Sequence, residues 1–472
     1  MHKTPVVACI GAGQLARMMA TAAGELGFTL RVLANSTEDS AAFALPSDQV
    51  IVGSPDDAET LSALLDGAQA LTFEHELIPD EAFDAAASAG IPARPSREAL
   101  LFAKDKLAMR RRLGEAGLPM PRWADGRDDA GVQALGESCG WPLIAKVSHG
   151  GYDGRGVAKV DSWEEFLQWR GGLEEGRACL VEECVPFTRE LAVMAGRRPS
   201  GEIRVWQPVQ TWQEEGQCAA VLAPAPGLAP EVATQAREMA RLISETLDVT
   251  GVFAVEMFLV EASAENGSAG GGLTNGGLTG NGLANDSLSS GVAAGEAGFN
   301  KGQPDSPALA GDGGIAAVSS VTRANLAMTA NSGNKGQNST SYGESTSMAE
   351  PRKARLLINE LAMRPHNSGH WTQDGCVTSQ FEQHLRATLD LPLGEATPTA
   401  RFTAMANVLG SNLEDPTDAV ATVMATCPEA KIHLYRKGNR PKRKLGHVNV
   451  SGEDPEAVLE KARAAADLLM GK

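Results

Sequence analysis

The residues best suited to chemistry in this sequence lie between positions 356 and 371. An apolar, strand-like run ends on Asn359 and Glu360, and the loop that follows carries five polar side chains within seven residues: Arg364, His366, Asn367, Ser368 and His370. Loops expose their side chains, so a loop this rich in donors and titratable groups is expected to hold a ligand rather than to build a core. The first candidate site therefore lies here.

A second carboxylate, Glu256, stands in the middle of the β-prone run 251–261, on the same strand face as apolar neighbours. The run 355–363, which contains Glu360, is also β-prone, so the two runs predict a hairpin in which Glu256 and Glu360 face one another. Two carboxylates held this close need a cation between them, and Mg²⁺ takes one or two carboxylates together with substrate phosphates. The alternative is two glutamates at strand edges that point into water.

Residues 262–353 separate these two runs and consist mainly of Gly, Asn, Ser, Thr and Ala. Such a segment cannot bury enough apolar surface to offset the entropy lost on ordering. We interpret it as a low-complexity, disordered insertion in the hairpin loop, with an interaction tether as the alternative. Closing so long a loop costs only about 2.5 kcal/mol more than closing a short one. Deletion of residues 264–350 is therefore expected to leave turnover intact.

The start of the chain predicts an α/β unit, in which the strand Val6–Ile10 leads through the glycine turn Gly11–Ala16 into a helix closed by Gly27. The turn matches the G-x-G-x-x-A dinucleotide fingerprint, so a nicotinamide oxidoreductase is a rival hypothesis. The acid that should end the second strand is missing, since none occurs before Glu38. A phosphate held by helix amides and a purely structural turn both stay open.

Two further acids, Glu74 and Glu76, end the strand-like run 70–76. They stand at the C-terminal end of a strand, which is the edge where open α/β sheets bind ligands. A structural role and a ligand contact are equally open for both residues.

A second glycine loop lies in the middle of the chain. The run 141–146 predicts a strand that ends on Lys146, and the loop 150–156 leads to a return strand, 157–160. Strand, glycine loop and strand form a flap whose backbone amides can approach phosphates where no side chain intrudes. The loop is not a P-loop, because no Gly-Lys-Ser/Thr follows. We interpret Lys146 as a phosphate contact, with a solvated lysine as the alternative.

The flanking segments supply further candidates for a nucleotide site. Ser96 is expected to cap a single helix that carries Lys106 and ends at Gly117. Acids at the end of the strand-like run 179–185, and Glu190 after them, could hold an adenine amino group or ribose hydroxyls. The alternative for these acids is an ordinary turn.

Composition sets outer limits. The 472 residues are 43% hydrophobic and 21% charged, which predicts a globular protein of two to four domains. A net charge of −17 argues against binding to a nucleic-acid backbone or an anionic membrane, and no apolar run reaches spanning length. Seven scattered cysteines without a Cys-x-x-Cys pair indicate neither a disulfide framework nor a zinc site, so a cytoplasmic location is expected.

Four motifs together carry a family resemblance: Gly-Gly-Tyr-Asp-Gly-Arg-Gly (150–156), Asn-Glu-Leu-Ala-Met-Arg-Pro-His-Asn-Ser-Gly-His-Trp (359–371), Ser-Gln-Phe-Glu-Gln-His-Leu-Arg (379–386) and Arg-Lys-Leu-Gly-His (443–447). The chain resembles 5-(carboxyamino)imidazole ribonucleotide synthase, the ATP-grasp carboxylase of purine biosynthesis, nearly throughout except for the insert. The second motif is highly specific. The resemblance implies an α/β and α+β architecture with an ATP-grasp fold, divided into a Rossmann-like N-terminal domain (1–100), an ATP-grasp domain interrupted by the insert (101–385) and a small C-terminal β-rich domain (386–472).

The resemblance also assigns roles to residues. Those expected around the ATP phosphates are Lys106, Lys146, Gly151, Tyr152, Asp153, Gly154, Arg155, Gly156 and Val157. Those expected around adenine and ribose are Glu182, Glu183, Cys184, Val185 and Glu190. Glu256 and Glu360 are expected to bind the divalent cation, with Asn359 beside them. Those expected around the ribonucleotide and bicarbonate are Gln14, Glu74, Tyr152, Asp153, Arg155, Arg364, His366, Asn367 and Ser368, with Lys437, Arg443 and Lys444 at the ribonucleotide phosphate.

The implied reaction joins bicarbonate to the amine of 5-aminoimidazole ribonucleotide and converts ATP to ADP and phosphate. Mg²⁺, or Mn²⁺ in its place, and Lys146 would neutralise charge while carboxyphosphate forms, and Arg364 would orient that intermediate. Asp153 is the first candidate for accepting the amine proton and His366 the second. The resemblance further implies a homodimer.

Other hypotheses remain beside this one. A related ATP-grasp ligase, such as the formate-using glycinamide ribonucleotide transformylase, would share the fold, and a catalytically inactive scaffold would hydrolyse no ATP. The spacing of His366 and His370 suits zinc poorly, because Ser and Gly lie between them and no His-Glu-x-x-His is present.

The chain also departs from the family pattern in three places. Met363 replaces a usual proline and Arg436 a usual glycine. The segment 207–216 is one residue shorter than expected and lacks the customary Asn and His, so it contributes no site residue.

Overall fold

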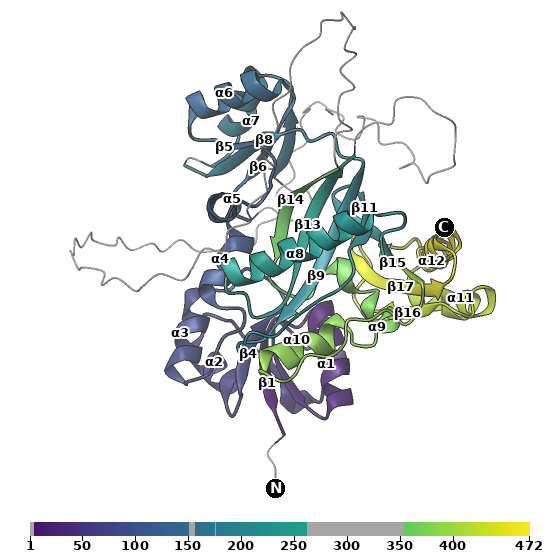
Figure 1. Cartoon of the computed structure of the whole chain (residues 1–472). Helices are drawn as coiled ribbons and strands as arrows, with labels where there is room; N and C mark the ends of the chain where they lie inside the picture. The colour runs from purple at the N-terminus through teal and green to yellow at the C-terminus, as the bar shows by residue number, and fades with distance from the viewer. Residues whose placement is uncertain (1–3, 151–155, 175, 262–353) are drawn as a thin grey trace, which may run out of the picture. The chain divides into compact units, whose positions relative to one another are not determined.

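The computed structural model describes residues 4–150, 156–174, 176–261 and 354–472 (Figure 1). The insert 262–353 and five residues of the glycine flap, Gly151, Tyr152, Asp153, Gly154 and Arg155, lie outside the described residues. The expectations for those residues therefore stay predictions.

The N-terminal segment forms a four-stranded parallel sheet in the order β3-β2-β1-β4. Its elements are β1 (Val6–Ile10), α1 (Gln14–Leu26), β2 (Thr29–Ala34), β3 (Val50–Val52), α2 (Ala58–Leu65), β4 (Ala70–Phe73) and α3 (Asp80–Ser88). Gly27 ends α1 with φ 69°, a conformation that glycine adopts without strain. The α/β unit expected from the sequence is confirmed.

The single helix expected between Ser96 and Gly117 is instead two helices, α4 (Arg97–Lys104) and α5 (Lys106–Glu115). Asp105 separates them, because its carboxylate accepts from the backbone amides of Leu107 and Ala108 at 2.9 and 3.1 Å. Such side-chain capping competes with continued helix formation. The break makes Lys106 the first residue of α5.

A second, four-stranded sheet follows in the order β5-β8-β6-β7. Its elements are β5 (Trp123–Asp125), α6 (Asp129–Cys139), β6 (Leu143–Val147), β7 (Val157–Val160), α7 (Trp163–Gly171) and β8 (Cys179–Glu183). The antiparallel pairing of β6 with β7 confirms the strands expected on either side of the glycine flap.

The largest sheet has nine strands, in the order β14-β13-β9-β11-β12-β15-β17-β16, with β10 beside β9 (Figure 1). These are β9 (Arg189–Arg197), β10 (Ile203–Val205), β11 (Val209–Glu214), β12 (Gln217–Ala223), β13 (Gly251–Val260), β14 (Arg355–Ala362), β15 (Phe402–Leu409), β16 (Lys431–Leu434) and β17 (Lys444–Gly452). Because β12 pairs with β15, the C-terminal strands extend the sheet that carries the hairpin.

The hairpin predicted across the insert is confirmed, since β13 and β14 pair antiparallel. Four helices pack on the sheet: α8 (Pro230–Thr246), α9 (Thr372–Gly375), α10 (Gln380–Thr388) and α12 (Pro455–Leu469). A fifth, α11 (Val420–Thr426), packs on α12. The helix α12 packs on β15 and β17, where apolar side chains from the helix and both strands form one core cluster.

The shortened segment 207–216 forms most of a tight hairpin between β11 and β12. Its two turn residues, Glu215 and Gly216, have φ 50° and 78°. Positive φ at both central residues is what a two-residue hairpin turn requires. The two strands pair on both sides of a register shift between Trp212 and Gln213, so the shortened segment still forms the β11–β12 hairpin.

Among the described residues, no helix combines the length and the apolar character needed to cross a membrane. The seven cysteines, all within the described residues, are free thiols.

Candidate active site

The two strand acids meet across the hairpin, since Glu256 of β13 lies directly opposite Glu360 of β14. Burial raises the pKa of Glu256 to about 8, and the nearby charges of Glu360 and Glu190 act in the same direction. A raised carboxyl pKa indicates a site where negative charges lie close together and are poorly hydrated. A cationic ligand would relieve that crowding.

A β-bulge lies at this pair, because Glu256 pairs with Glu360 while the next residue, Met257, pairs with Ile358. Asn359 is thus the extra residue of β14. In a regular strand consecutive side chains point to opposite faces, whereas a bulge re-aims one of them. Asn359 and Glu360, consecutive in sequence, are both half-buried and both contact lysines of the candidate nucleotide site.

Those lysines come from two separate elements. Lys106, at the start of α5, pairs with Glu360. Lys146, near the end of β6, donates to Asn359 Oδ1 at 3.0 Å and pairs with Glu182. The structure therefore brings the hairpin acids together with the lysine that precedes the flap.

Glu182 is buried, with 2% of its surface exposed, and does not lie in an exposed turn. Burial opposes its ionisation, yet Lys146 and Arg110 together lower its pKa. Arg110 was missed from the sequence, although Leu107, Arg110 and Leu113 share the three-residue spacing of one helix face. In the sequence, an arginine spaced three residues from a leucine on each side indicated a buried cation on this helix.

The remaining adenine and ribose candidates differ from one another. Glu183 pairs with Arg122 at 2.8 Å, Cys184 is exposed and Val185 is half-buried. Glu190 lies within β9 rather than after a strand, opposite Phe258 of β13 and on the same sheet face as Glu256. Burial raises the pKa of Glu190 to about 7, against the lowering effect of Lys146.

The polar loop after β14 is more buried than expected. Ser368 and His370 are 1% and 0% exposed, and Asn367 is also buried. The expectation that this loop exposes its side chains is wrong, because a 3-10 turn and Gln380 fold it against β9 and α10. Gln380 accepts from the backbone N–H of His366 at 2.8 Å and donates to its carbonyl at 2.9 Å.

Two side chains of the loop still contact acids of the candidate site, one in the hairpin and one after β4. His366 Nε2 lies 3.3 Å from Glu256 Oε1, and Arg364 pairs with Glu76 at 2.9 Å. Burial, followed by the charges of Arg364 and Lys444, lowers the pKa of His366 to about 3. His366 is therefore neutral at physiological pH, and Ser368 Oγ lies 2.9 Å from its Nδ1.

The N-terminal glycine turn is filled by a side chain of the protein. Glu74 accepts from the backbone N–H groups of Gly13 and Ala16, so its carboxylate sits at the N-terminus of α1. A Cβ atom at Gly11 or Gly13 would overlap that carboxylate, which explains both glycines. The anion position that a nicotinamide dinucleotide would need is thus held by Glu74, which argues against that hypothesis.

Of the basic residues expected at the ribonucleotide phosphate, Lys437 lies at this turn and Lys444 lies near the hairpin. Lys437 donates to Gln14 at the start of α1, and burial lowers the pKa of Lys437. Lys444 begins β17, and its charge acts on both Glu256 and His366. Arg443 donates to the carbonyl of Gly438 at 3.1 Å.

The described residues include Gly156, which ends the glycine loop, and Val157 after it. Gly156 has φ 74°, and a Cβ there would collide with Val147. Val157, the first residue of β7, is exposed.

The hairpin acids fit a divalent cation that brings other ligands with it. Within the described ranges, no group of three or more His, Cys, Asp or Glu side chains is arranged to hold a metal ion. Two opposed carboxylates suit Mg²⁺, which commonly takes one or two protein carboxylates and completes its shell with phosphate oxygens and water. The donor set is therefore compatible with a metal–nucleotide complex.

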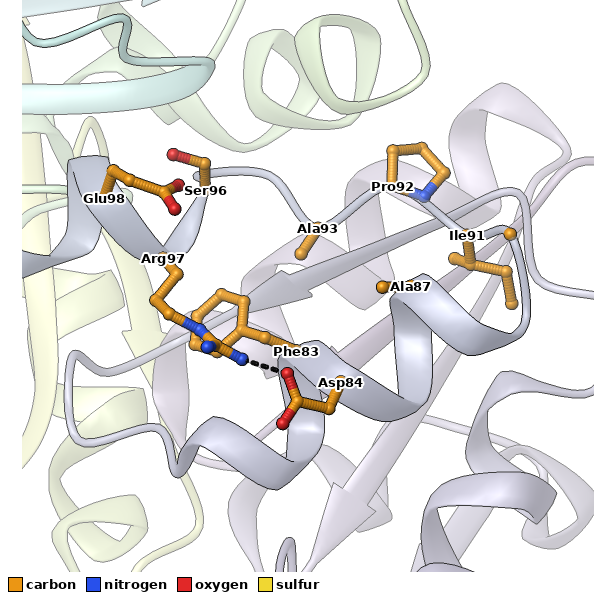
Figure 2. Close-up of a pocket in the computed structure, with 10 residues that line it drawn as sticks. Phe83, Asp84, Ala87, Ile91, Pro92, Ala93, Ser96, Arg97 and Glu98 are labelled. Atoms are coloured by element: carbon orange, nitrogen blue, oxygen red, sulfur yellow. Dashed lines mark hydrogen bonds and ion pairs between the residues drawn. The ribbon is translucent and has the colours of Figure 1, made fainter. Parts of the chain in front are cut away.

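A surface cavity beside α3 and α4 is unrelated to this site (Figure 2). Arg97 lies across the ring of Phe83 there and donates to Asp84. None of the residues predicted for catalysis or nucleotide binding lines that cavity.

Comparison with protein families matches the chain in three segments. Residues 4–104 match the ribonucleotide synthetase preATP-grasp domain, residues 111–265 and 350–381 the ATP-grasp domain, and residues 403–461 the phosphoribosylaminoimidazole carboxylase C-terminal domain. The fold class expected from the sequence is confirmed.

Relatives match nearly the whole length. N5-carboxyaminoimidazole ribonucleotide synthase of Mycobacterium tuberculosis is 37% identical, covering 98% of this chain and 88% of the relative. The enzyme of that name from Corynebacterium ammoniagenes is also 37% identical, over 99% and 92%. The crystal structure of the N5-carboxyaminoimidazole ribonucleotide synthetase from Thermus thermophilus has a TM-score of 0.70 at 27% identity, over 99% of both chains. An Aspergillus clavatus enzyme in complex with ADP and 5-aminoimidazole ribonucleotide has a TM-score of 0.72 over 99% of both chains, and at 24% identity it supports the fold alone.

Proposed function

The chain belongs to the N5-carboxyaminoimidazole ribonucleotide synthases, and we propose that its site around Glu256 and Glu360 performs the ATP-dependent carboxylation of 5-aminoimidazole ribonucleotide. The product is N5-carboxyaminoimidazole ribonucleotide, and the reaction is a carbon–nitrogen ligation of purine biosynthesis. The enzyme is accordingly an ATP-grasp ligase.

The observation that carries the proposal is the opposition of Glu256 and Glu360 beside Lys106 and Lys146. Phosphoryl transfer requires little covalent chemistry from the protein and depends on positioning and on neutralising the charge that spreads over the γ-phosphate. Two acids for a cation and two lysines for phosphate oxygens meet that need. Glu190, on the same sheet face, is proposed to bind the ribose hydroxyls.

Glu256 and Glu360 would hold Mg²⁺, or Mn²⁺ in its place, and the ion would supply positive charge at the β- and γ-phosphates. With the ATP phosphates also held by Lys106 and Lys146, an oxygen of bicarbonate attacks the γ-phosphorus while the bond to ADP breaks. This step gives carboxyphosphate. The amine nitrogen then attacks the carboxyl carbon and phosphate leaves.

Arg364, from the loop after β14, is proposed to hold the carboxylate during these steps, with Glu76 fixing its direction at 2.9 Å. The amine must lose a proton. The pKa of His366, lowered to about 3 by burial, makes it a weak acceptor at neutral pH, which leaves Asp153 as the first proposal. Asp153 itself lies outside the described residues.

The ribonucleotide is proposed to bind between the glycine turn and the start of β17. Lys437, Arg443 and Lys444 would hold its phosphate, and Gln14 and Glu74 would contact its sugar or base. A local group of cations suffices for one phosphate even in a chain with a net charge of −17. A cytosolic homodimer is proposed in addition.

Substrate-dependent phosphate release tests the activity directly. With ATP and Mg²⁺, release should require both 5-aminoimidazole ribonucleotide and bicarbonate. Glycinamide ribonucleotide with formate should give no release above the ATP-only rate. The opposite pattern would assign the chain to the transformylase reaction, and no release with either pair would indicate an inactive scaffold.

A further inference from the structure

Arg110 is a fully buried arginine whose contacts no assigned role explains. It lies in α5, is 1% exposed, and reaches two other elements. Its Nη2 pairs with Glu182 Oε2 of β8 at 2.7 Å, and its Nη1 donates to the carbonyl of Ile358 at 2.9 Å. Its Nη2 also donates to the carbonyl of Asn359 at 3.0 Å.

The first consequence concerns the bulge. Asn359 has no partner opposite it in β13, so its carbonyl and that of Ile358 lie where the ladder is disrupted. Arg110 donates to both. An unsatisfied buried carbonyl is costly, so the guanidinium stabilises the bulged backbone. That bulge is what places the side chains of Asn359 and Glu360 together beside the lysines.

The second consequence concerns charge. Glu182 is shared between Arg110 and Lys146. When Lys146 turns toward an anionic ligand, Glu182 would be left as a buried, unpaired carboxylate if Arg110 were absent. Breaking a buried ion pair on one side is strongly unfavourable, so Lys146 would then stay bound to Glu182. Arg110 keeps Glu182 paired and leaves Lys146 free to exchange partners.

We infer that Arg110 is a positioning residue for nucleotide binding, acting through the Asn359 bulge and through Glu182 on Lys146. It is not proposed to touch ATP. The inference rests on the proposed function, in which Lys146 and Asn359 belong to the ATP site.

The test compares Arg110→Met with Arg111→Met in the full-length enzyme. Arg111 is the next residue of α5, is half exposed on its side chain and pairs with Asp125 at 2.9 Å, so it controls for loss of an arginine from this helix. Arg110→Met should raise the KM for ATP and the Kd for Mg-ADP at least tenfold, and shift the KM for 5-aminoimidazole ribonucleotide less than threefold. Arg111→Met should change neither. Equal rises in both KM values, or an ATP KM within twofold of the parent, would overturn the inference.

A double-mutant cycle separates this role from general loss of structure. The cost of Arg110→Met in Mg-ADP affinity should be at least threefold smaller in a Glu182→Gln background, because no unpaired carboxylate then competes for Lys146. An equal cost in both backgrounds would contradict the inference.

If Arg110→Met does not fold, the variant Arg110→Lys is tested instead, since an ammonium keeps the charge but lacks the planar fork of a guanidinium. Arg110→Lys should raise the KM for ATP by threefold or more while the KM for the ribonucleotide stays constant. An unchanged KM for ATP in this variant would refute the inference.

Lys146→Met distinguishes this inference from the proposed function. If Lys146→Met binds Mg-ADP as tightly as the parent, the proposed ATP site is wrong. If Lys146→Met loses binding while Arg110→Met keeps it, only the role of Arg110 is wrong.

Discussion

The hairpin acids lie within two paired strands and the N-terminal glycine turn lies at the start of a helix, and the charges in these two regions are balanced in different ways. At the turn, the carboxylate of Glu74 meets the amides of Gly13 and Ala16, so the protein supplies both partners. At the hairpin, Glu256 faces another acid, and its pKa is raised to about 8 by burial and by that neighbour.

The difference indicates where a ligand completes the structure. A carboxylate fully paired by the protein stabilises the fold, whereas at the hairpin the pairing of Lys106 with Glu360 does not offset the burial and like charge that raise the pKa of Glu256, so a further cation is favoured there. The turn therefore serves mainly to position Glu74 and Gln14, and the hairpin is the place where binding changes the electrostatics.

Neutralising the hairpin acids should have the largest effect. Glu256→Gln and Glu360→Gln are each expected to lower kcat by roughly 10²–10³-fold, because less charge remains to hold the cation against the phosphates. Steady-state phosphate release measures this. Glu261→Gln is the matched control, since Glu261 follows the same strand and pairs with Arg189 near the surface. Full activity in both variants would show that the carboxylates of Glu256 and Glu360 are not needed for the reaction.

Removing the carboxylate at the glycine turn should act on stability. Glu74→Ala is expected to lower the free energy of unfolding by about 1–2 kcal/mol, since α1 loses its anionic N-terminal partner. Urea unfolding followed by circular dichroism measures the change. Glu25→Ala, on an exposed position of the same helix, should stay within about 0.5 kcal/mol of the parent. A larger loss in Glu25→Ala than in Glu74→Ala would contradict the capping role.

The pH dependence of stability should separate the two regions further. Burial raises the pKa of Glu190 to about 7 and that of Glu256 to about 8, from an ordinary value of 4.5. At pH values between 4.5 and these raised values, the two acids hold more protons in the folded state than in the unfolded state. The contribution of these two acids to the free energy of unfolding of the ligand-free protein should therefore fall as pH rises from about 5 to 8. The buried histidines His366 and His384, whose pKa is lowered to about 3, contribute in the opposite direction up to about pH 6.5, so the two acids must be isolated by comparison with a variant.

Urea midpoints at pH 5.5, 6.5 and 7.5 test this slope. The difference in unfolding free energy between the parent and the double variant Glu190→Gln/Glu256→Gln should fall over the same interval, because the histidines titrate alike in both proteins. A difference that stays constant from pH 5.5 to 7.5 would contradict the raised pKa values of the two acids.

The smallest effect is expected at Arg436, in the loop that brings Lys437 to the glycine turn. Arg436 has φ 53°, a conformation that glycine adopts without strain, and its guanidinium lies 4.4 Å from the centre of the Phe43 ring. Arg436→Gly removes the backbone strain of the positive φ but also loses the contact with the Phe43 ring. Because these two effects oppose each other, the unfolding free energy of this variant should stay within about 0.5 kcal/mol of the parent. Arg436→Ala loses the contact without that relief and should be the less stable variant in urea unfolding. The reverse order would show that the positive φ carries no cost.

The sequence by itself determined the strands, the hairpin and the family. Strand periodicity predicted that Glu256 and Glu360 would face one another, and the register confirms it, because side-chain alternation is a local property of the chain. The motif around Glu360 carried the family resemblance because its residue types are specific to one reaction.

Only the tertiary structure decided how the charges are shared. Two-residue periodicity gives no sign of the bulge at Asn359, since a bulge depends on the partner strand. The burial of Ser368 and His370 arises from contacts with segments distant in sequence, whereas the break at Asp105 is a local cap that helix periodicity alone does not reveal. Whether a carboxylate such as Glu74 or Glu182 meets a ligand or the protein's own donors depends on which segments fold against it, and that is decided by long-range packing rather than by local pattern.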